Sequence, residues 1–108
     1  MKMIWAVVRS NKVEAIARAL KKIGVSGCTV CPVRGYGEEW HRYEPLIHGA
    51  HYKLETIVRD AEVDGVVKSI LAEAHSGHEG DGVLTVLELN EVVSIKTKAP
   101  TREKISEQ

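Results

Sequence analysis

Two apolar stripes at helical spacing, each lying between strand-like segments, leave few folds open to this chain. The stripes fall within residues 13–23 and 63–74. The strand-like segments are residues 2–9, 27–34, 52–58 and 82–88, with a shorter one at 91–96. The order β-α-β-β-α-β predicts an α+β, ferredoxin-like sandwich with a short extra strand near the C-terminus.

Capping residues set the expected helix boundaries. Asn11 and Glu14 have capping-box spacing at the first helix, and Gly24 occupies the place of a left-handed C-terminal cap. Asp60 is expected to cap the second helix and Gly77 to end it.

The first strand is apolar on both of its faces, which bears on assembly. Each helix has only one apolar stripe, so both helices are expected to cover the same face of the sheet. In residues 2–9, Met3, Trp5 and Val7 alternate with three further apolar residues. An uncovered apolar face is a large patch for a monomer. We therefore predict oligomerisation through the sheet.

Composition excludes several classes of protein. The 108 residues carry 15 basic and 15 acidic side chains, so no electrostatic footprint for nucleic acid is present. No apolar run approaches the roughly 20 residues that span a bilayer, and residues 2–9 are better interpreted as a strand than as a signal peptide. Two cysteines are consistent with a reducing compartment. We expect a cytoplasmic protein with one domain at 1–98, a long exposed loop at 38–51 and a mobile polar tail at 99–108.

A glycine-rich turn is the strongest local signal for ligand binding. Gly77, Gly80 and Gly82 free the backbone to direct several N–H groups toward one anion, although Gly-Asp-Gly is also an ordinary turn. The basic residues Lys96, Lys98 and Arg102 could neutralise that anion.

Several segments together resemble the PII signal-transduction superfamily. The N-terminal half resembles the family in residues 1–9, 24–30 and 33–37, and residues 92–97 resemble its closing strand. Residues 76–82 resemble the signature threonine-glycine-x-x-glycine-aspartate-glycine, with Ser76 in place of the threonine. The resemblance covers residues 1–37 and 52–98 and suggests a divergent branch with an altered T-loop, the family's long loop.

The resemblance implies a homotrimer whose sheets face a common axis, with adenine nucleotides bound in the clefts between subunits. By this resemblance Val7, Thr29 and Ile57 surround the adenine. The residues expected near ribose and phosphates are Gly35, Tyr36, Gly37, Gly80, Asp81, Gly82 and Lys96, which takes the place of an arginine.

Departures from the family pattern change the expected ligand. The family's lysine after Gly-Asp-Gly is Val83 here, and one of its C-terminal arginines is Ser94. A binding site with fewer cations favours a nucleotide with fewer phosphate groups, so we expect ADP or AMP to compete well with ATP.

The long loop departs further from the pattern. Glu38, Glu39 and Trp40 stand where the family places the glutamine that helps to hold magnesium and 2-oxoglutarate. The family's lysine that pairs with 2-oxoglutarate is also missing. Binding of that dicarboxylate is therefore disfavoured, which leaves a small anion such as bicarbonate, or another metabolite, as an alternative second ligand. Weaker candidates for holding it are Arg34, Arg42 and Lys53.

The same loop is expected to contact a target protein, either a membrane transporter or a metabolic enzyme. An exposed tryptophan is typical of a binding hot spot, which favours this role for Trp40. The partner or second-ligand residues are Glu38, Glu39, Trp40, Arg42 and Tyr52. Residues 49–52 resemble the family's uridylylated tyrosine motif, yet Tyr52 is expected to pack at the start of a strand.

Metal binding and catalysis receive less support. Cys28 and Cys31 are expected on one strand at odd separation, so they should face opposite sides. The histidines are interpreted as solvated, and they are His41, His48, His51, His75 and His78. No catalytic residue, metal or cofactor is predicted. Two alternatives stay open. One is a metal-responsive, PII-like or CutA-like trimer using the loop histidines, and the other is a small ferredoxin-like enzyme or a non-catalytic oligomerisation domain.

Overall fold

The computed structural model describes residues 1–35 and 51–101, and the elements follow the expected order. The assignments made above for residues 36–50 and 102–108 lie outside this part. The elements are β1 (Lys2–Arg9), α1 (Val13–Lys22), β2 (Thr29–Val33), β3 (His51–Val58), α2 (Val63–Ala74), β4 (Gly82–Glu88), β5 (Val92–Ser94) and β6 (Ala99–Thr101).

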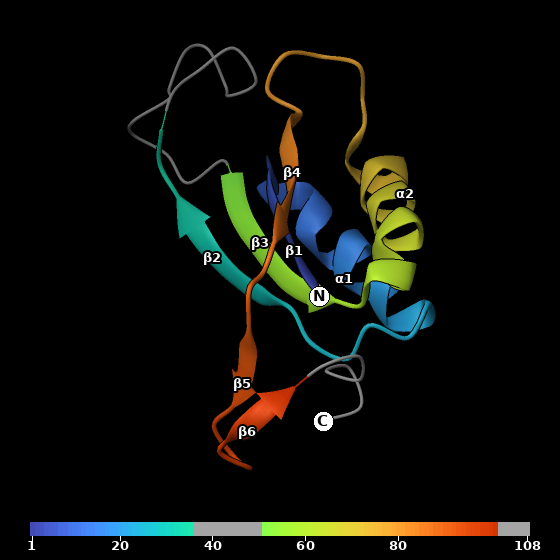
Figure 1. The fold of residues 1–108 in the computed structure, drawn as a ribbon. Helices are drawn as coiled ribbons and strands as arrows, with labels where there is room; N and C mark the ends of the chain where they lie inside the picture. Colours follow the sequence, from blue (N-terminus) through green and yellow to red (C-terminus); the bar gives the residue numbers. More distant parts are fainter. Residues whose placement is uncertain (36–50, 102–108) are drawn as a thin grey trace.

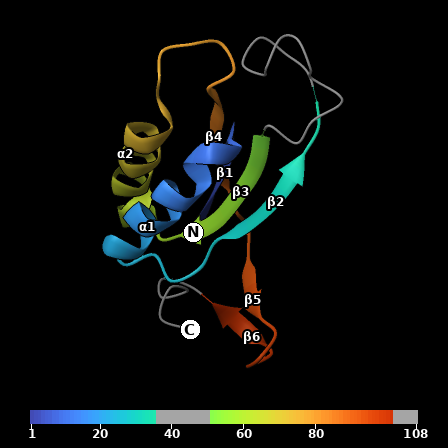
Figure 2. The same cartoon turned by 180° about the vertical axis from the view of Figure 1, so that it is seen from behind.

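The main sheet has the strand order β2-β3-β1-β4, with every neighbouring pair antiparallel. Both helices cover the same face of this sheet, as the two opposite views show (Figures 1 and 2). The predicted ferredoxin-like sandwich is therefore confirmed.

The core lies between the helices and the sheet. Ile4, Ala6 and Val8 of β1 point into it, and each is at most 3% exposed. Burying one large aliphatic side chain contributes about 1.5–3 kcal/mol. The other core residues are Ile16, Leu20, Val25, Leu54, Val58, Val66, Ile70 and Ala74.

The opposite face of the sheet carries the alternate residues of the same strands, and we call it the open face. Opposed residues of an antiparallel pair share a face, so Met3 groups with Leu87 and Val7 with Val83. Leu87 is 40% exposed and Val83 is 42% exposed. The helices thus leave uncovered a face that is apolar along β1 and β4, as expected, and that also carries the charged Lys53 and Glu55 of β3.

Both predicted helix starts were wrong in their capping residues. Each α-helix is preceded by a short 3₁₀ turn, and the α-helical N-cap residues Lys12 and Glu62 make no side-chain capping hydrogen bond. Before α2, Glu62 Oε1 instead accepts a hydrogen bond from the N–H of Arg59 at 2.9 Å. The 3₁₀ turn supplies a backbone acceptor, since Ser10 O accepts from the N–H of Val13. Asn11 is therefore not needed as a cap. Asp60 instead accepts a hydrogen bond from the Met1 ammonium at 2.9 Å.

The helix ends agree with expectation at one helix only. Gly24 follows α1 with φ +93°, as predicted for a left-handed cap. α2 already ends at Ala74, because His75 takes an extended conformation with φ −70° and ψ 129°. Gly77 lies in the following turn with φ +86°.

The C-terminal part differs from the expected polar tail. β5 and β6 form a separate two-stranded antiparallel sheet, in which Ser94 pairs with Ala99. Lys98, in the connection, has φ +59°, a conformation that closes the hairpin. The hairpin projects from the main body (Figure 1). Within the described residues, no helix has the length and apolar character needed to cross a membrane.

Candidate functional site

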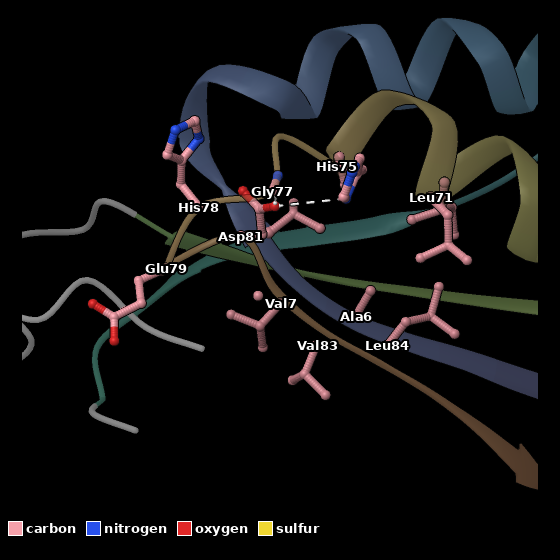
Figure 3. A pocket seen from close by; sticks show the side chains of 14 residues that line it. Ala6, Val7, Leu71, His75, Gly77, His78, Glu79, Asp81, Val83 and Leu84 are labelled. Carbon is pink, nitrogen blue, oxygen red and sulfur yellow. Dashed lines mark hydrogen bonds and ion pairs between the residues drawn. The ribbon is translucent and has the colours of Figure 1, made fainter. Parts of the chain in front are cut away.

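The glycine-rich turn between α2 and β4 closes one end of a cavity of about 430 Å³. Strands β1 and β4 and the end of α2 form the rest of its lining. Figure 3 shows Asp81 and His75 facing each other at this cavity, with Val7 and Val83 nearby. The lining residues include Val7, Leu71, His75, His78, Asp81 and Gly82.

Asp81 holds the turn together from within. Its Oδ2 accepts hydrogen bonds from the N–H groups of Ser76 and Gly77, both at 2.8 Å. Its Oδ1 accepts one from the Ser76 hydroxyl and one from Arg9 Nε at 3.3 Å. These donors, above all the hydroxyl of Ser76, hold the pKa of Asp81 well below its usual range. The side chain is 16% exposed, so the carboxylate is largely used for organising the turn.

Two side chains from neighbouring strands grip the turn from the sheet side. Arg9 of β1 and His51 of β3 are directly opposed in the antiparallel register. Arg9 Nη2 donates to the carbonyl oxygen of Glu79 at 2.5 Å. His51 Nε2 lies 2.7 Å from the carbonyl oxygen of Gly80, and since a carbonyl only accepts, Nε2 is the donor. We call Arg9 and His51 the clamp.

Two glycines are required by the backbone path of the turn. Gly82 has φ +107°, and a Cβ there would lie 1.8 Å from the carbonyl oxygen of Val7. Gly80 has φ +93°, and a Cβ there would lie 3.0 Å from the guanidinium of Arg9. These conformations and contacts exclude ordinary side chains.

A second hollow, of about 400 Å³, lies near the other end of β1. Thr29 and Ile57 line it together with Met3, and in the strand register all three fall on the open face. Thr56 anchors its rim, because its hydroxyl donates to the carbonyl of Gly27 at 2.7 Å.

The structure brings some predicted site residues together and separates others. Val7, Gly80, Asp81 and Gly82 meet at the turn, whereas Thr29 and Ile57 belong to the second hollow. Lys96 is exposed in the connection between β5 and β6, at the opposite end of the molecule from the turn (Figures 1 and 2).

The remaining predicted residues lie around the long loop. Gly35 is partly buried just after β2. Tyr52 is a partly buried residue of β3, on the helix-covered face opposite Val8, which agrees with the expected packing role. Residues outside the described part are Tyr36, Gly37, Glu38, Glu39, Trp40 and Arg42.

The interpretation of His51 as a solvated loop residue was wrong. β3 begins at His51, one residue earlier than expected, and the side chain is 3% exposed. Cys28 also differs from expectation, since it precedes β2 and does not lie on it. Within residues 1–35 and 51–101, no three His, Cys, Asp or Glu side chains gather as a metal site. The expected loop histidines His41 and His48 lie outside this part.

Sequence reasoning assigned no role in the turn to Arg9 or His51, and it treated Ser76 only as a substitute in a motif. The register of β1 against β3 is what places Arg9 beside His51. Register depends on pairing across the sheet, and no local pattern in either strand specifies it. The Ser76–Asp81 pair could have been found, because a hydroxyl residue five positions before an aspartate in a glycine-rich turn is a local signal.

Comparison with known proteins gives one consistent answer. The family profile described as "Nitrogen regulatory protein P-II" matches residues 1–99. A nitrogen regulatory protein P-II of Pasteurella multocida is 33% identical over 90% of this chain and 93% of its own length. Nitrogen regulatory protein GlnK of Escherichia coli is 32% identical with the same coverage. Nitrogen regulatory protein P-II 2 of Methanothermobacter thermautotrophicus is 37% identical over 90% of each chain.

Proposed function

The chain belongs to the P-II nitrogen regulatory protein family, and on this premise we propose that it senses an adenine nucleotide in clefts between the subunits of a homotrimer. The family consists of non-catalytic signal transducers. The protein thus acts by changing its affinity for a target protein when the ligand binds, which requires that the ligand favour one conformation over another.

One observation supports a binding cleft that lies between subunits. The turn with Asp81 lies at one end of the chain, and Lys96 lies on the hairpin at the other end (Figure 1). No single nucleotide reaches both within one chain. A site that uses both groups is therefore built from two copies, with the hairpin of one copy reaching the turn of the next.

The open face supports the trimer. It presents Met3, Trp5 and Leu87 on the side of the sheet that carries no helix. Packing three such faces around an axis would bury these side chains. It would also bring the second hollow, with Thr29 and Ile57, close to a neighbouring subunit.

The charge of the cleft favours a nucleotide with few phosphates. Val83, in the position of the family's lysine, is an exposed apolar residue at the start of β4. Apart from the exposed histidines, the cation that the described residues place at the turn is Arg9, and its Nε is already paired with Asp81. We therefore favour ADP or AMP over ATP as the ligand.

The target protein is a membrane transporter or a metabolic enzyme, contacted from the cytoplasm through residues 38–51 and through Trp40 in particular. A small anion such as bicarbonate is the second ligand. Metal sensing is the weaker alternative, because the buried ring of His51 is engaged with Gly80.

Calorimetric titration with AMP, ADP and ATP, combined with sedimentation, tests the proposal. We expect a trimer that binds ADP and AMP with affinities within about tenfold of that for ATP, because the cations missing at Val83 and Ser94 would otherwise favour the ligand with more phosphates. A stable monomer indifferent to all three nucleotides would overturn it. Stoichiometric zinc binding without nucleotide binding would establish the metal-sensing alternative instead.

A further inference from the structure

The clamp formed by Arg9 and His51 fixes the direction of two consecutive peptide groups in the glycine-rich turn. Arg9 holds the carbonyl of Glu79, and His51 holds the carbonyl of Gly80. Both donors come from the sheet, from directly opposed positions of β1 and β3. The two carbonyls therefore point toward the sheet.

The direction of the carbonyls determines that of the amides. The peptide bonds of the described residues are trans, and in a trans peptide the N–H points opposite to the C=O. The N–H of Gly80 is thus directed away from Arg9. In the same way, the N–H of Asp81 is directed away from His51, and it makes only a 3.3 Å hydrogen bond to His78.

The amide of Gly80 is a donor without an acceptor among the described residues. Gly80 is buried, and its N–H has no hydrogen-bond acceptor in the part of the chain that the structure describes. Leaving such a donor unpaired is unfavourable, because the N–H has lost its water and gained no hydrogen bond in exchange. By contrast, Asp81 already occupies the N–H groups of Ser76 and Gly77, so these two are not available to an external anion.

We propose that Arg9 and His51 are positioning residues that hold the Gly80 N–H toward the phosphate of the bound nucleotide. This inference rests on the proposed function, since it concerns the same site. Arg9 also places a cation in contact with the turn, where the family's following lysine is replaced by Val83. β3 begins at His51, so the hydrogen bond from His51 to Gly80 also joins the first residue of β3 to the turn.

The experiment compares ligands that differ only in phosphate. Calorimetry measures the affinities for ADP and for adenosine in the whole protein and in His51→Leu, which removes the donor to Gly80. His51→Gln is the conservative variant, because the glutamine amide still donates. Arg18→Met, at an exposed position of α1, is the matched control for charge removal.

We expect His51→Leu to weaken ADP binding about tenfold, to change adenosine binding less than about twofold, and to be rescued by His51→Gln. Arg9→Met should give the same selective loss. Arg9→Lys should rescue only in part, because one ammonium cannot reproduce the fork that bonds Asp81 and Glu79 together. Equal losses for ADP and adenosine, or no loss for either, would overturn the proposal.

A second measurement separates this inference from the proposed function. Amide ¹⁵N–¹H NMR follows the Gly80 signal during titration with inorganic pyrophosphate. The inference expects a shift of that signal that is lost in His51→Leu and kept in His51→Gln. If neither nucleotide nor adenosine binds but this pattern is seen, the proposed function fails while the clamp stands. A Gly80 signal that pyrophosphate does not shift would refute the clamp.

Discussion

At the scale of single residues, the side chains and glycines of the turn have different structural roles. Gly82 allows β4 to pass close to β1, Asp81 closes the turn, and the clamp directs its peptide groups. The roles of Gly82 and Asp81 predict measurable effects of substitution on the stability of the fold, separate from any effect on ligand binding.

Gly82→Ala should strongly destabilise the protein. The new Cβ would lie 1.8 Å from the carbonyl oxygen of Val7, and φ +107° is unfavourable for alanine. A loss of about 3 kcal/mol or more in the free energy of unfolding is expected, measured by urea denaturation at fixed protein concentration. Gly65→Ala is the control, because a Cβ there meets nothing within 4 Å and the position is helical. It should stabilise by about 0.5–1 kcal/mol, and equal effects of both substitutions would contradict the structure.

Asp81→Asn should remove part of the acid sensitivity of the fold. The folded-state pKa of Asp81 is lowered, chiefly by Ser76, so its stabilising contribution is complete above the unfolded-state pKa of about 4. The contribution is lost as the pH falls through and below that value, toward the lower folded-state pKa. Urea denaturation should therefore show a wild-type advantage over Asp81→Asn at pH 7 that shrinks toward pH 3. A difference that is constant with pH would show that the charge of Asp81 is not involved.

At the scale of elements, apolar periodicity was enough to predict every strand of the main sheet, both helices and the layer they form. The N-terminal caps of both helices, the end of α2, the start of β3 and the extra strand β6 were not predicted, because each depends on a partner distant in sequence or on a choice between turn types. Asp60, for example, has the composition of a cap and binds the Met1 ammonium instead. The site followed the same rule. Its glycines and Asp81 are local signals, whereas Arg9 and His51 become neighbours only through strand register.

Deleting residues 40–48 should spare the fold and remove binding to the target protein. Val33 and His51 are paired across β2 and β3, so their backbones are only about 5 Å apart. Residues 34–39 and 49–50 are enough to bridge that distance. A shorter loop also loses less conformational entropy when its ends are brought together. Circular dichroism and thermal denaturation should match the whole protein. A variant that fails to fold would assign residues 40–48 to the framework.

At the scale of the whole molecule, the open face is the surface through which we propose that the three copies meet. Trp5 lies at its centre, opposite Glu55 on β3 and Thr85 on β4. Three copies that meet through this face would place three Trp5 side chains near the common axis.

Trp5→Lys should therefore convert the trimer into monomers, because three ammonium groups would repel one another in a region that loses water on assembly. Sedimentation velocity measures the change directly. Ile23→Lys introduces the same charge at an exposed apolar position just after α1, on the other side of the sheet, and should leave the trimer intact. If Trp5→Lys stays trimeric, the open face is not the contact between subunits.

The hairpin that projects away from the main body has a consequence for mixed populations of the protein. We consider a site that takes its turn from one chain and Lys96 from the next. Asp81→Ala then damages the part of the site that the first chain supplies, and Lys96→Ala damages the part that the second chain supplies. Trimers made of either variant alone would have no intact site. Co-refolding the two would give mixed rings with one junction at which both halves are wild type. Two variants that do not bind nucleotide by themselves should thus complement each other. Nucleotide binding by the mixture, and by neither variant alone, would show that two chains contribute to every site.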